Sequence, residues 1–463
     1  MQNDKKEQKF DKTIIEGSIP KAVWKMAWPT IMQNMIAGLQ GLIDHTLVGH
    51  YVGYQGNAAI GVGWQIFLVI VVFMSSLSIG MSVLISHAVG AGDKDQVNKI
   101  FYQALITALI IGCLVIAPLG YFSAPYLLDL VKAESLVKAE SLPYLQIMFL
   151  FNIGLLFFFM MGGGLRAAGD AKTPLKLGAI LTILNIIFNI VLIRGFGPIP
   201  ALGTKGSAIG TTAAAAVMTL IGLYLLLSKK LVLRLPPLKD LAPDFSIIRS
   251  IFSLGLPAGF QGIAMNIGGV ILLRFIGMLQ NSAETQAAYS VAYSQLFSLI
   301  TWTSVGLMSA SAVITGQNLG AKKFDRVKKT VVTTSLLGFS LALIIGSLFV
   351  AIPTQMLTLF GIENPLVISI GKELLAYLSL SGIFITIALT CTGGLQGTGD
   401  TRSPLYISLV SQVFIPLGLC FFIKSFRVLQ PTDIWTAILL GHLFRASLTI
   451  IRFQQRVKNL ALG

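Results

Sequence analysis

The sequence predicts an all-α protein that crosses the membrane twelve times and folds as two pseudo-symmetric lobes of six helices each. Two observations predict this fold: apolar residues dominate the composition, and a set of short motifs occurs twice, about 230 residues apart. Of the 463 residues, 54% are hydrophobic and only 11% are charged. A soluble domain carries about 25% charged residues. The chain is therefore a polytopic membrane protein.

Twelve segments are long and apolar enough to span a membrane, because about 20 residues of helix cover a hydrocarbon core of roughly 30 Å. The lysine-rich start resembles a signal peptide, but the apolar run after it is too long and lacks a small-residue cleavage site, so we expect a retained helix. The approximate cores of the spans are Pro29 to Val48, Ile60 to Ile85, Ile100 to Tyr121, Leu145 to Leu165, Leu177 to Ile193, Ala208 to Leu227, Ile251 to Met278, Ala288 to Ile314, Val331 to Ile352, Leu374 to Gly394, Leu405 to Ile423 and Ile434 to Ile451.

The net charge of +15 is spread over many loops along the chain. A nucleic-acid-binding domain concentrates its charge on one soluble face, so we expect no nucleic-acid partner. Most of the 34 Lys and Arg lie in the two tails and in alternate loops. The positive-inside rule then places both termini in the cytoplasm of a multi-pass plasma-membrane protein, which in a bacterium means the inner membrane. Cys113, Cys391 and Cys420 have neither disulfide nor metal-ligand spacing, and we expect no cofactor and no metal site.

The chain contains an internal repeat. Gly163 to Pro174 reads GGLRAAGDAKTP, and Gly393 to Pro404 reads GGLQGTGDTRSP, at an offset of 230. Two further matches lie at nearly the same offset: Gly90-Ala91 with Gly320-Ala321, and Pro29 and Gln33 with Pro257 and Gln261. Each repeat holds six crossings, an even number, so both enter the membrane from the same side. We expect a pseudo-two-fold axis along the membrane normal and a cavity between the halves.

The repeat also predicts the domain boundaries: an N-lobe over 1–228, a cytoplasmic linker over 229–250 and a C-lobe over 251–463. The linker contains Pro236, Pro237 and Pro243, which interrupt helix continuation. A tandem copy of VKAESL lies within Tyr121 to Pro143, and we expect a short external helix there.

Asp44 is the one acid that we place well inside a helix; the others fall in loops, tails or outermost turns, with Glu373 the least certain. A carboxylate at mid-bilayer depth costs roughly 2.5 to 3.5 kcal/mol on insertion scales, so an intramembrane acid is by default a functional candidate. The structural alternative is that Asp44 caps a helix end or pairs with His45 or an arginine.

Three features together resemble the MATE (multidrug and toxic compound extrusion) family, and in particular its DinF-like branch. These are the lysine-flanked first helix with Pro29 and a late Gly-Leu-Ile-Asp, the duplicated Gly-Ala loop, and the duplicated Gly-Asp-x-x-x-Pro turn, which in the second copy reads Gly-x-Gly-Asp-x-x-x-Pro. The resemblance covers essentially the whole chain. It implies a two-lobed antiporter that exports small organic, often cationic or amphipathic compounds in exchange for a proton or sodium. We expect it to work as a monomer in the lipid bilayer.

The resemblance also implies an ion-coupling site. Asp44 matches the coupling acid of the DinF-like branch, Asn185 and Thr211 match their family counterparts, and Asn189 replaces a second carboxylate. Residues four apart share a helix face, so both asparagines can point at Asp44. Burial disfavours the charged form of a lone carboxylate, which favours proton exchange over sodium. The acids that the NorM-like branch carries in helices seven and ten are absent from this sequence.

For the substrate cavity the resemblance implies Gln40, which matches a polar cavity residue of the family. In the second lobe we expect Gln261, Met265, Tyr289 and Tyr293 to line the cavity, where adaptable side chains suit varied substrates. Pro29 is a candidate hinge, since its family counterpart is linked to bending of the first helix. We expect Arg274 and Arg445 to snorkel or to be paired structural charges. We expect His442 to be a packing residue.

Three alternative functions remain open. The first is a sodium-coupled exporter. The second is a flippase for a lipid-linked oligosaccharide, which would need a strongly cationic cavity for the pyrophosphate. The third is a non-transporting membrane scaffold, which needs neither a buried acid nor a repeat with helix-breaking residues. An enzyme is disfavoured, because no nucleophile–base pair, phosphate loop or metal spacing is present in any loop.

Overall fold

The computed structural model describes residues 10–235 and 242–462, most of which are helical. Within these ranges the only β pairing is one isolated antiparallel bridge between Phe196 and Ile199. Pro236 and Pro237 of the predicted linker lie outside the described residues.

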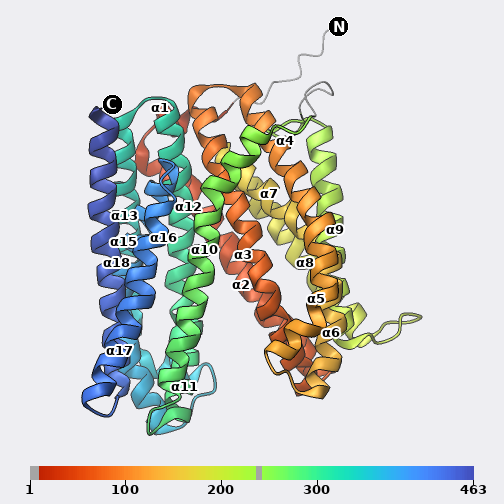
Figure 1. The fold of residues 1–463 in the computed structure, drawn as a ribbon, viewed down its shortest axis with the longest axis vertical. Helices are drawn as coiled ribbons and strands as arrows, with labels where there is room; N and C mark the ends of the chain where they lie inside the picture. Colours follow the sequence, from red (N-terminus) through yellow and green to blue (C-terminus); the bar gives the residue numbers. More distant parts are fainter. Residues whose placement is uncertain (1–9, 236–241, 463) are drawn as a thin grey trace. The chain divides into compact units, whose positions relative to one another are not determined.

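Figure 1 labels most of the helices, which follow one another through the first repeat with short connections. A π-helical segment, η1, continues α4 into α5, so these three elements form one span. The elements are α1 (Thr13–Glu16), α2 (Ile19–Tyr51), α3 (Tyr54–Ala91), α4 (Lys94–Ile111), η1 (Gly112–Ile116), α5 (Ala117–Leu130), α6 (Ser135–Leu150), α7 (Ile153–Ala167), α8 (Lys172–Arg194) and α9 (Gly203–Leu227).

In the second repeat, two spans again contain a π-helical segment, which places one extra residue in a helical turn. The elements are α10 (Phe245–Ile276), α11 (Ser282–Tyr289), η3 (Ser290–Leu296), α12 (Ser298–Gly320), α13 (Phe324–Ala351), α14 (Pro353–Thr358), α15 (Pro365–Gly397), α16 (Arg402–Ser408), η4 (Leu409–Phe414), α17 (Ile415–Phe426) and α18 (Pro431–Leu462). α10 begins at Phe245, within the segment predicted as linker.

Ten helices of the described chain are long and apolar enough to cross a membrane, and the bent pair of α6 and α7, which meet at 52°, makes an eleventh span. α2 is the remaining long helix, with 33 residues. Its polar residues, among them Gln33, Gln40 and Asp44, lower its hydropathy. The layout agrees with twelve predicted spans.

Between α5 and α6, where a short external helix was expected, the described chain has no separate helix. The first VKAESL copy begins in the turn after α5, and the second copy lies inside α6. Lys132 has a positive φ of 53° and reverses the chain between the two helices. The tandem repeat therefore forms a tight turn and the first part of a membrane helix.

The chain divides into two compact units, and the boundaries fall inside α2 and α10. Of the described residues, the first unit holds 10–11, 32–235 and 242–256, and the second holds 12–31 and 257–462. The crossing points are next to the two duplicated prolines, Pro29 and Pro257. Each of these helices thus begins in one unit and ends in the other.

Within the second unit, Arg326 of α13 anchors the start of the chain. Its guanidinium donates to the backbone oxygens of Ile14 and Gly17, at 3.2 and 2.8 Å, and to Asn318 Oδ1 at 2.9 Å. Lys323 adds a bond to the oxygen of Ile15 at 3.3 Å. These contacts hold α1 against the start of α13 within the second unit.

The duplicated turn has the same backbone in both units. Gly169 and Gly399 have positive φ values of 96° and 82°, a conformation that glycine adopts without strain. In each copy the glycine N–H and the N–H of the following aspartate bond back to the preceding helix, which ends it in a Schellman motif. Each aspartate then accepts from the backbone N–H three residues on and so caps the next helix: Asp170 from Thr173, and Asp400 from Ser403.

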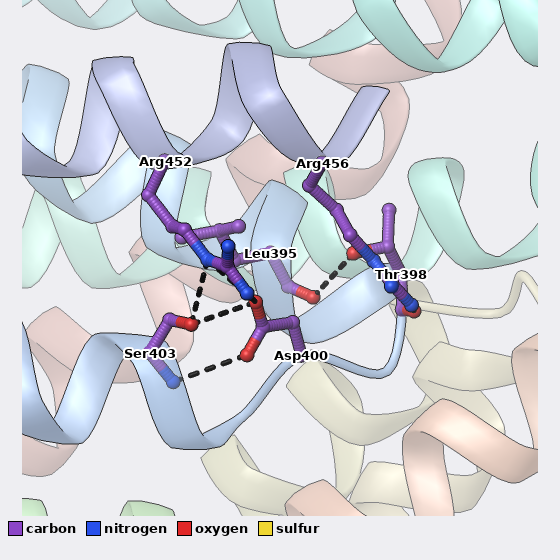
Figure 2. Close-up of polar contacts among 6 residues, drawn as sticks. All are labelled: Leu395, Thr398, Asp400, Ser403, Arg452 and Arg456. Atoms are coloured by element: carbon purple, nitrogen blue, oxygen red, sulfur yellow. Dashed lines mark hydrogen bonds and ion pairs between the residues drawn. The ribbon is translucent and has the colours of Figure 1, made fainter. Parts of the chain in front are cut away.

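The two copies differ in their side-chain partners. Figure 2 shows Arg452 of α18 reaching the loop of the second copy, where its Nε and Nη2 lie 3.1 and 3.0 Å from Asp400 Oδ2. Arg456, one turn further along α18, donates to the oxygen of Thr398 at 3.0 Å. No comparable ion pair to Asp170 is present among the described residues. Charged side chains of α18, the last helix of the second unit, therefore hold the turn at Gly399 in place.

Candidate functional site

The carboxylate of Asp44 is held by an amide from another helix of the first unit. Asn189 of α8 donates from Nδ2 to Asp44 Oδ1 at 2.8 Å. Asn189 is fully buried, whereas Asp44 is half-buried. His45, the expected alternative partner of Asp44, instead contacts Asn57, with 2.5 Å between Nδ1 and Oδ1. The acid therefore faces α8 and not a helix end.

Two more of the predicted coupling residues extend this contact into a chain. Asn189 Nδ2 lies 3.4 Å from Asn185 Oδ1, and Asn185 Nδ2 donates to Thr211 Oγ1 of α9 at 3.0 Å. All four predicted residues are thus connected by hydrogen bonds within the first unit. Only Asn189 reaches Asp44, however, because Asn185 lies one turn away and is engaged by Thr211.

A glycine makes room for this arrangement. A Cβ at Gly210 of α9 would lie 2.1 Å from Asn189 Oδ1, so any side chain there would displace the amide. The same Oδ1 is buried and has no hydrogen-bond partner among the described residues. The site therefore contains one carboxylate, one engaged amide donor and one spare amide acceptor.

The contact is one part of a polar seam between α2 and α8. One turn before Asp44 on α2, Gln40 Oε1 accepts from Thr182 Oγ1 of α8 at 2.8 Å. Thr182, Asn185 and Asn189 are spaced by three and four residues and so share one face of α8. Gln40, predicted for the substrate cavity, therefore lies next to the coupling site. Its bond to Thr182 joins the same two helices, α2 and α8, as the bond between Asn189 and Asp44.

A second acid of the first unit lies deeper in a helix than the sequence predicts. Glu140 is in the second turn of α6, and its Oε2 accepts from Thr204 Oγ1 of α9 at 2.5 Å. Thr204 is itself fully buried. Thr204 is the second residue of α9, so this contact lies at the start of that helix. Thr211, which belongs to the predicted coupling site, is about two helical turns further along α9.

In the second unit, three of the predicted cavity residues line one cavity of about 440 Å³. Met265 comes from α10, Tyr289 from α11 and Tyr293 from η3. The two tyrosine rings are stacked, with centroids 4.8 Å apart and planes at 10°. Gln261 does not belong to its described lining: it is buried, and its Nε2 donates to Ser408 Oγ at 2.7 Å, so it joins α10 to α16.

Comparison with known proteins assigns the chain to a family. The MatE profile matches residues 29–191 and 257–422, which is most of the sequence. The chain belongs to the MatE family.

Its MATE relatives cover nearly its full length at low identity. The "Probable multidrug resistance protein NorM" of Thermotoga maritima is 24% identical, over 94% of this chain and 92% of that protein. The "Probable multidrug resistance protein YoeA" of Bacillus subtilis is 24% identical, over 88% and 87%. A structure described as the outward-facing conformation of a multidrug resistance MATE family transporter superposes with a TM-score of 0.91 at 20% identity, covering 98% of this chain and 100% of that one.

These findings confirm the predicted family, the all-α membrane fold and a transporter rather than an enzyme. The two stretches that match the MATE profile begin at Pro29 and Pro257, the prolines that mark the repeat. The assignment to the DinF-like branch and the roles of the individual residues stay predictions.

The sequence did not predict that one arginine, Arg445, is buried without an ion-pair partner among the described residues. Arg274 is exposed, in agreement with a snorkelling side chain. Arg445, by contrast, is 1% exposed and makes no ion pair within the described part of the chain. The expectation that it snorkels or is paired is therefore wrong. An arginine in the middle of the last span was the available signal, but burial on all sides is set by tertiary packing, which one helix does not reveal.

Proposed function

We propose that this MATE transporter is a cation-coupled exporter of small organic, often cationic compounds, and that Asp44 is its coupling group. The observation that carries the proposal is the hydrogen bond from Asn189 to Asp44 within a connected polar set of the first unit. The names of its relatives, probable multidrug resistance proteins, support the substrate class.

The contacts of Asp44 favour a proton as the coupling ion. The described residues bring neither a second carboxylate nor a cation into hydrogen-bond contact with it. One donor, Asn189 Nδ2, stabilises the ionised acid. Asn189 also carries one unpartnered acceptor, Oδ1, which a rotation of its side-chain amide would present to a protonated acid. The same amide thus offers a hydrogen bond to each protonation state, and sodium remains the alternative ion because oxygen ligands also suit it.

Pro29 is the proposed hinge for this coupling. A proline inside a helix has no N–H to donate to the residue four before it, which here is Lys25. α2 belongs to the second unit up to Ile31 and to the first unit from Met32, the part that carries Asp44. We propose alternating access in which a change of charge at Asp44 alters α2 about Pro29. A proton and a substrate drive such a cycle only if they bind its two states differently.

We further propose that both termini are cytoplasmic and that the protein acts as a monomer in the plasma membrane. The distribution of Lys and Arg between alternate loops supports this orientation. A cysteine placed in the N-terminal tail and labelled with an impermeant maleimide in intact cells tests it. We expect labelling only after the membrane is opened.

The test is transport by purified protein in liposomes, with a proton gradient and a sodium gradient imposed separately. We expect ethidium to be moved against its gradient when protons alone are supplied. Asp44→Asn should reduce the rate to that of empty liposomes while the protein stays folded, and Asp170→Asn, which removes an acid of the duplicated turn, should retain transport. Full activity of Asp44→Asn under a proton gradient would refute the assignment, and transport driven only by sodium would replace the ion.

A further inference from the structure

Arg445 is a buried cation without a partner. It lies near the middle of α18, with 1% of its surface exposed. Its Nε is buried without a hydrogen bond, and no hydrogen bond or ion pair of the guanidinium to any described residue is present. Arg166 in the first unit offers a contrast, since its Nη1 donates to Gln33 Oε1 at 3.2 Å.

The acids nearest in sequence to Arg445 are already engaged. Asp433 accepts from both terminal nitrogens of Arg427, at 2.5 and 2.9 Å, and Asp400 accepts from Arg452. An uncompensated buried charge is costly, and an ionisable residue inside a membrane is by default part of a functional site with a partner. For Arg445 the described chain does not supply that partner, so a ligand of the second unit is the remaining source of a negative charge.

The cavity of the second unit lies next to this arginine. His442 lines the cavity and is one turn before Arg445 on α18. Tyr293, on the same cavity wall, lies within electrostatic range of Arg445. His442 is 2% exposed, and its Nδ1 is a second buried polar atom without a partner among the described residues. One wall of the cavity therefore combines a free ring nitrogen with a positive charge behind it.

The aromatic part of the cavity lining is suited to a flat ring. Tyr289, Tyr293 and His442 line the cavity. They belong to a run of stacked rings that continues behind the lining through Trp435 and Phe297. Tyr293 and Gln412, which both line the cavity, lie in the π-helical segments η3 and η4. Such segments are frequent at functional sites. Polar contacts at the cavity are available from Asn266, Ser294 and Gln412.

We propose that the second unit binds aromatic carboxylates, with the ring against Tyr289 and Tyr293 and the acid group at the wall formed by Tyr293 and His442, in front of Arg445. As a substrate class for export, this rests on the function proposed above and extends it: the transporter accepts organic anions and amphoteric compounds as well as cations. Arg445 acts through its charge from behind the cavity wall, and His442 contributes the nearest unpartnered polar atom.

The test compares two probes with the same ring and opposite charge, 2-naphthoate and 2-naphthylmethylammonium, bound to the full-length protein in detergent and measured by equilibrium dialysis. Arg445→Gln should weaken binding of naphthoate at least about tenfold, because loss of one charge interaction in a low-dielectric site exceeds about 1.4 kcal/mol. Binding of the ammonium probe should be unchanged or tighter. Arg274→Gln, which removes an exposed arginine from the same unit, should leave both affinities unchanged.

Two further variants test the same site if Arg445→Gln does not fold. Arg445→Lys retains the charge and should retain most of the naphthoate affinity. Met265→Trp fills the cavity from α10 and should abolish naphthoate binding while Arg445 is intact. Equal loss of both probes in Arg445→Gln, or naphthoate binding that survives Met265→Trp, would overturn the proposal. Because binding is measured at equilibrium without a gradient, failure of coupled transport leaves this result interpretable.

Discussion

The two units share a backbone plan but carry opposite charges in their membrane-embedded interiors. In the first unit the carboxylate of Asp44 is satisfied by Asn189 within a connected polar set. In the second unit the guanidinium of Arg445 is buried without any partner among the described residues. Counted by the offset of 228 between Pro29 and Pro257, the position of Asp44 corresponds to Leu272, which is buried.

The two repeats have therefore kept the same backbone turns but differ in the charged residues of their interiors. The turns at Gly169 and Gly399 are alike because each requires a glycine with positive φ. The interior charges are placed independently in each half. We infer that the repeat provides two similar helical frames, and that the first is specialised for a coupling ion and the second for the acid group of a ligand.

The first prediction concerns Asn189, which donates the hydrogen bond to Asp44. Asn189→Leu deletes a hydrogen bond to a charged group, worth about 1.5 to 3 kcal/mol, so we expect proton-driven ethidium transport to fall about tenfold or more. Asn185→Leu deletes a bond between neutral groups, worth about 0.5 to 1.5 kcal/mol, and should cost only a few-fold. Initial rates in proteoliposomes measure both. Equal losses would show that the set acts as a unit rather than through Asn189.

The second prediction concerns the space beside Asn189. Gly210→Ala places a Cβ 2.1 Å from Asn189 Oδ1, and overpacking of this kind costs about 1 to 3 kcal/mol. We expect transport to fall several-fold and the thermal midpoint to drop. Gly418→Ala in the second unit is the matched control, because its Cβ meets no atom within 4 Å. If both variants behave like the parent protein, Asn189 is not held as tightly as its surroundings indicate.

The fold was predictable because its determinants are local. Apolar length predicts each span, and the recurrence of a glycine–aspartate turn predicts the duplication. The spacing of Asn185 and Asn189 also correctly placed both on one face of α8. Sequence spacing did not reveal that only Asn189 reaches Asp44, because that depends on the position of α9, whose Thr211 engages Asn185.

The contacts that were missed all depend on packing between helices. The bond from Thr182 to Gln40 was not predicted, since a threonine in a membrane helix also satisfies its hydroxyl on its own backbone, as Thr212 does here. Gln261 was expected at a cavity but is engaged by Ser408, a residue 147 positions away. Arg445 was expected to snorkel or to be paired, but it is buried and has no ion-pair partner among the described residues.

The third prediction tests the charge difference between the two copies of the turn. Arg452→Gln removes an ion pair to Asp400, and since Arg452 is partly exposed we expect a loss of about 1 to 2 kcal/mol in the free energy of unfolding. Asp170→Asn, in the first copy, should cost only a few tenths of a kcal/mol, because asparagine caps a helix about as well as aspartate. Thermal midpoints in detergent compare the two. Similar losses would mean that the cap, and not the ion pair, holds the second turn.

The smallest expected effect lies where α10 begins, outside the membrane-spanning part of the chain. Lys99 lies 2.6 Å from Asp244, and its hydrogen bond holds the pKa of that carboxyl below its usual range. A depressed pKa contributes stability above the ordinary aspartate value of about 3.9, and this stability is lost as the pH falls through the lower folded value. Lys99→Gln should therefore lower the thermal midpoint slightly at pH 7 and lose this effect in acid, whereas the exposed Lys329→Gln should show no such pH dependence. Because the pair is partly exposed, high salt should also reduce the difference at pH 7. A difference that persists in acid would mean that Lys99 supports the start of α10 through packing and not through charge.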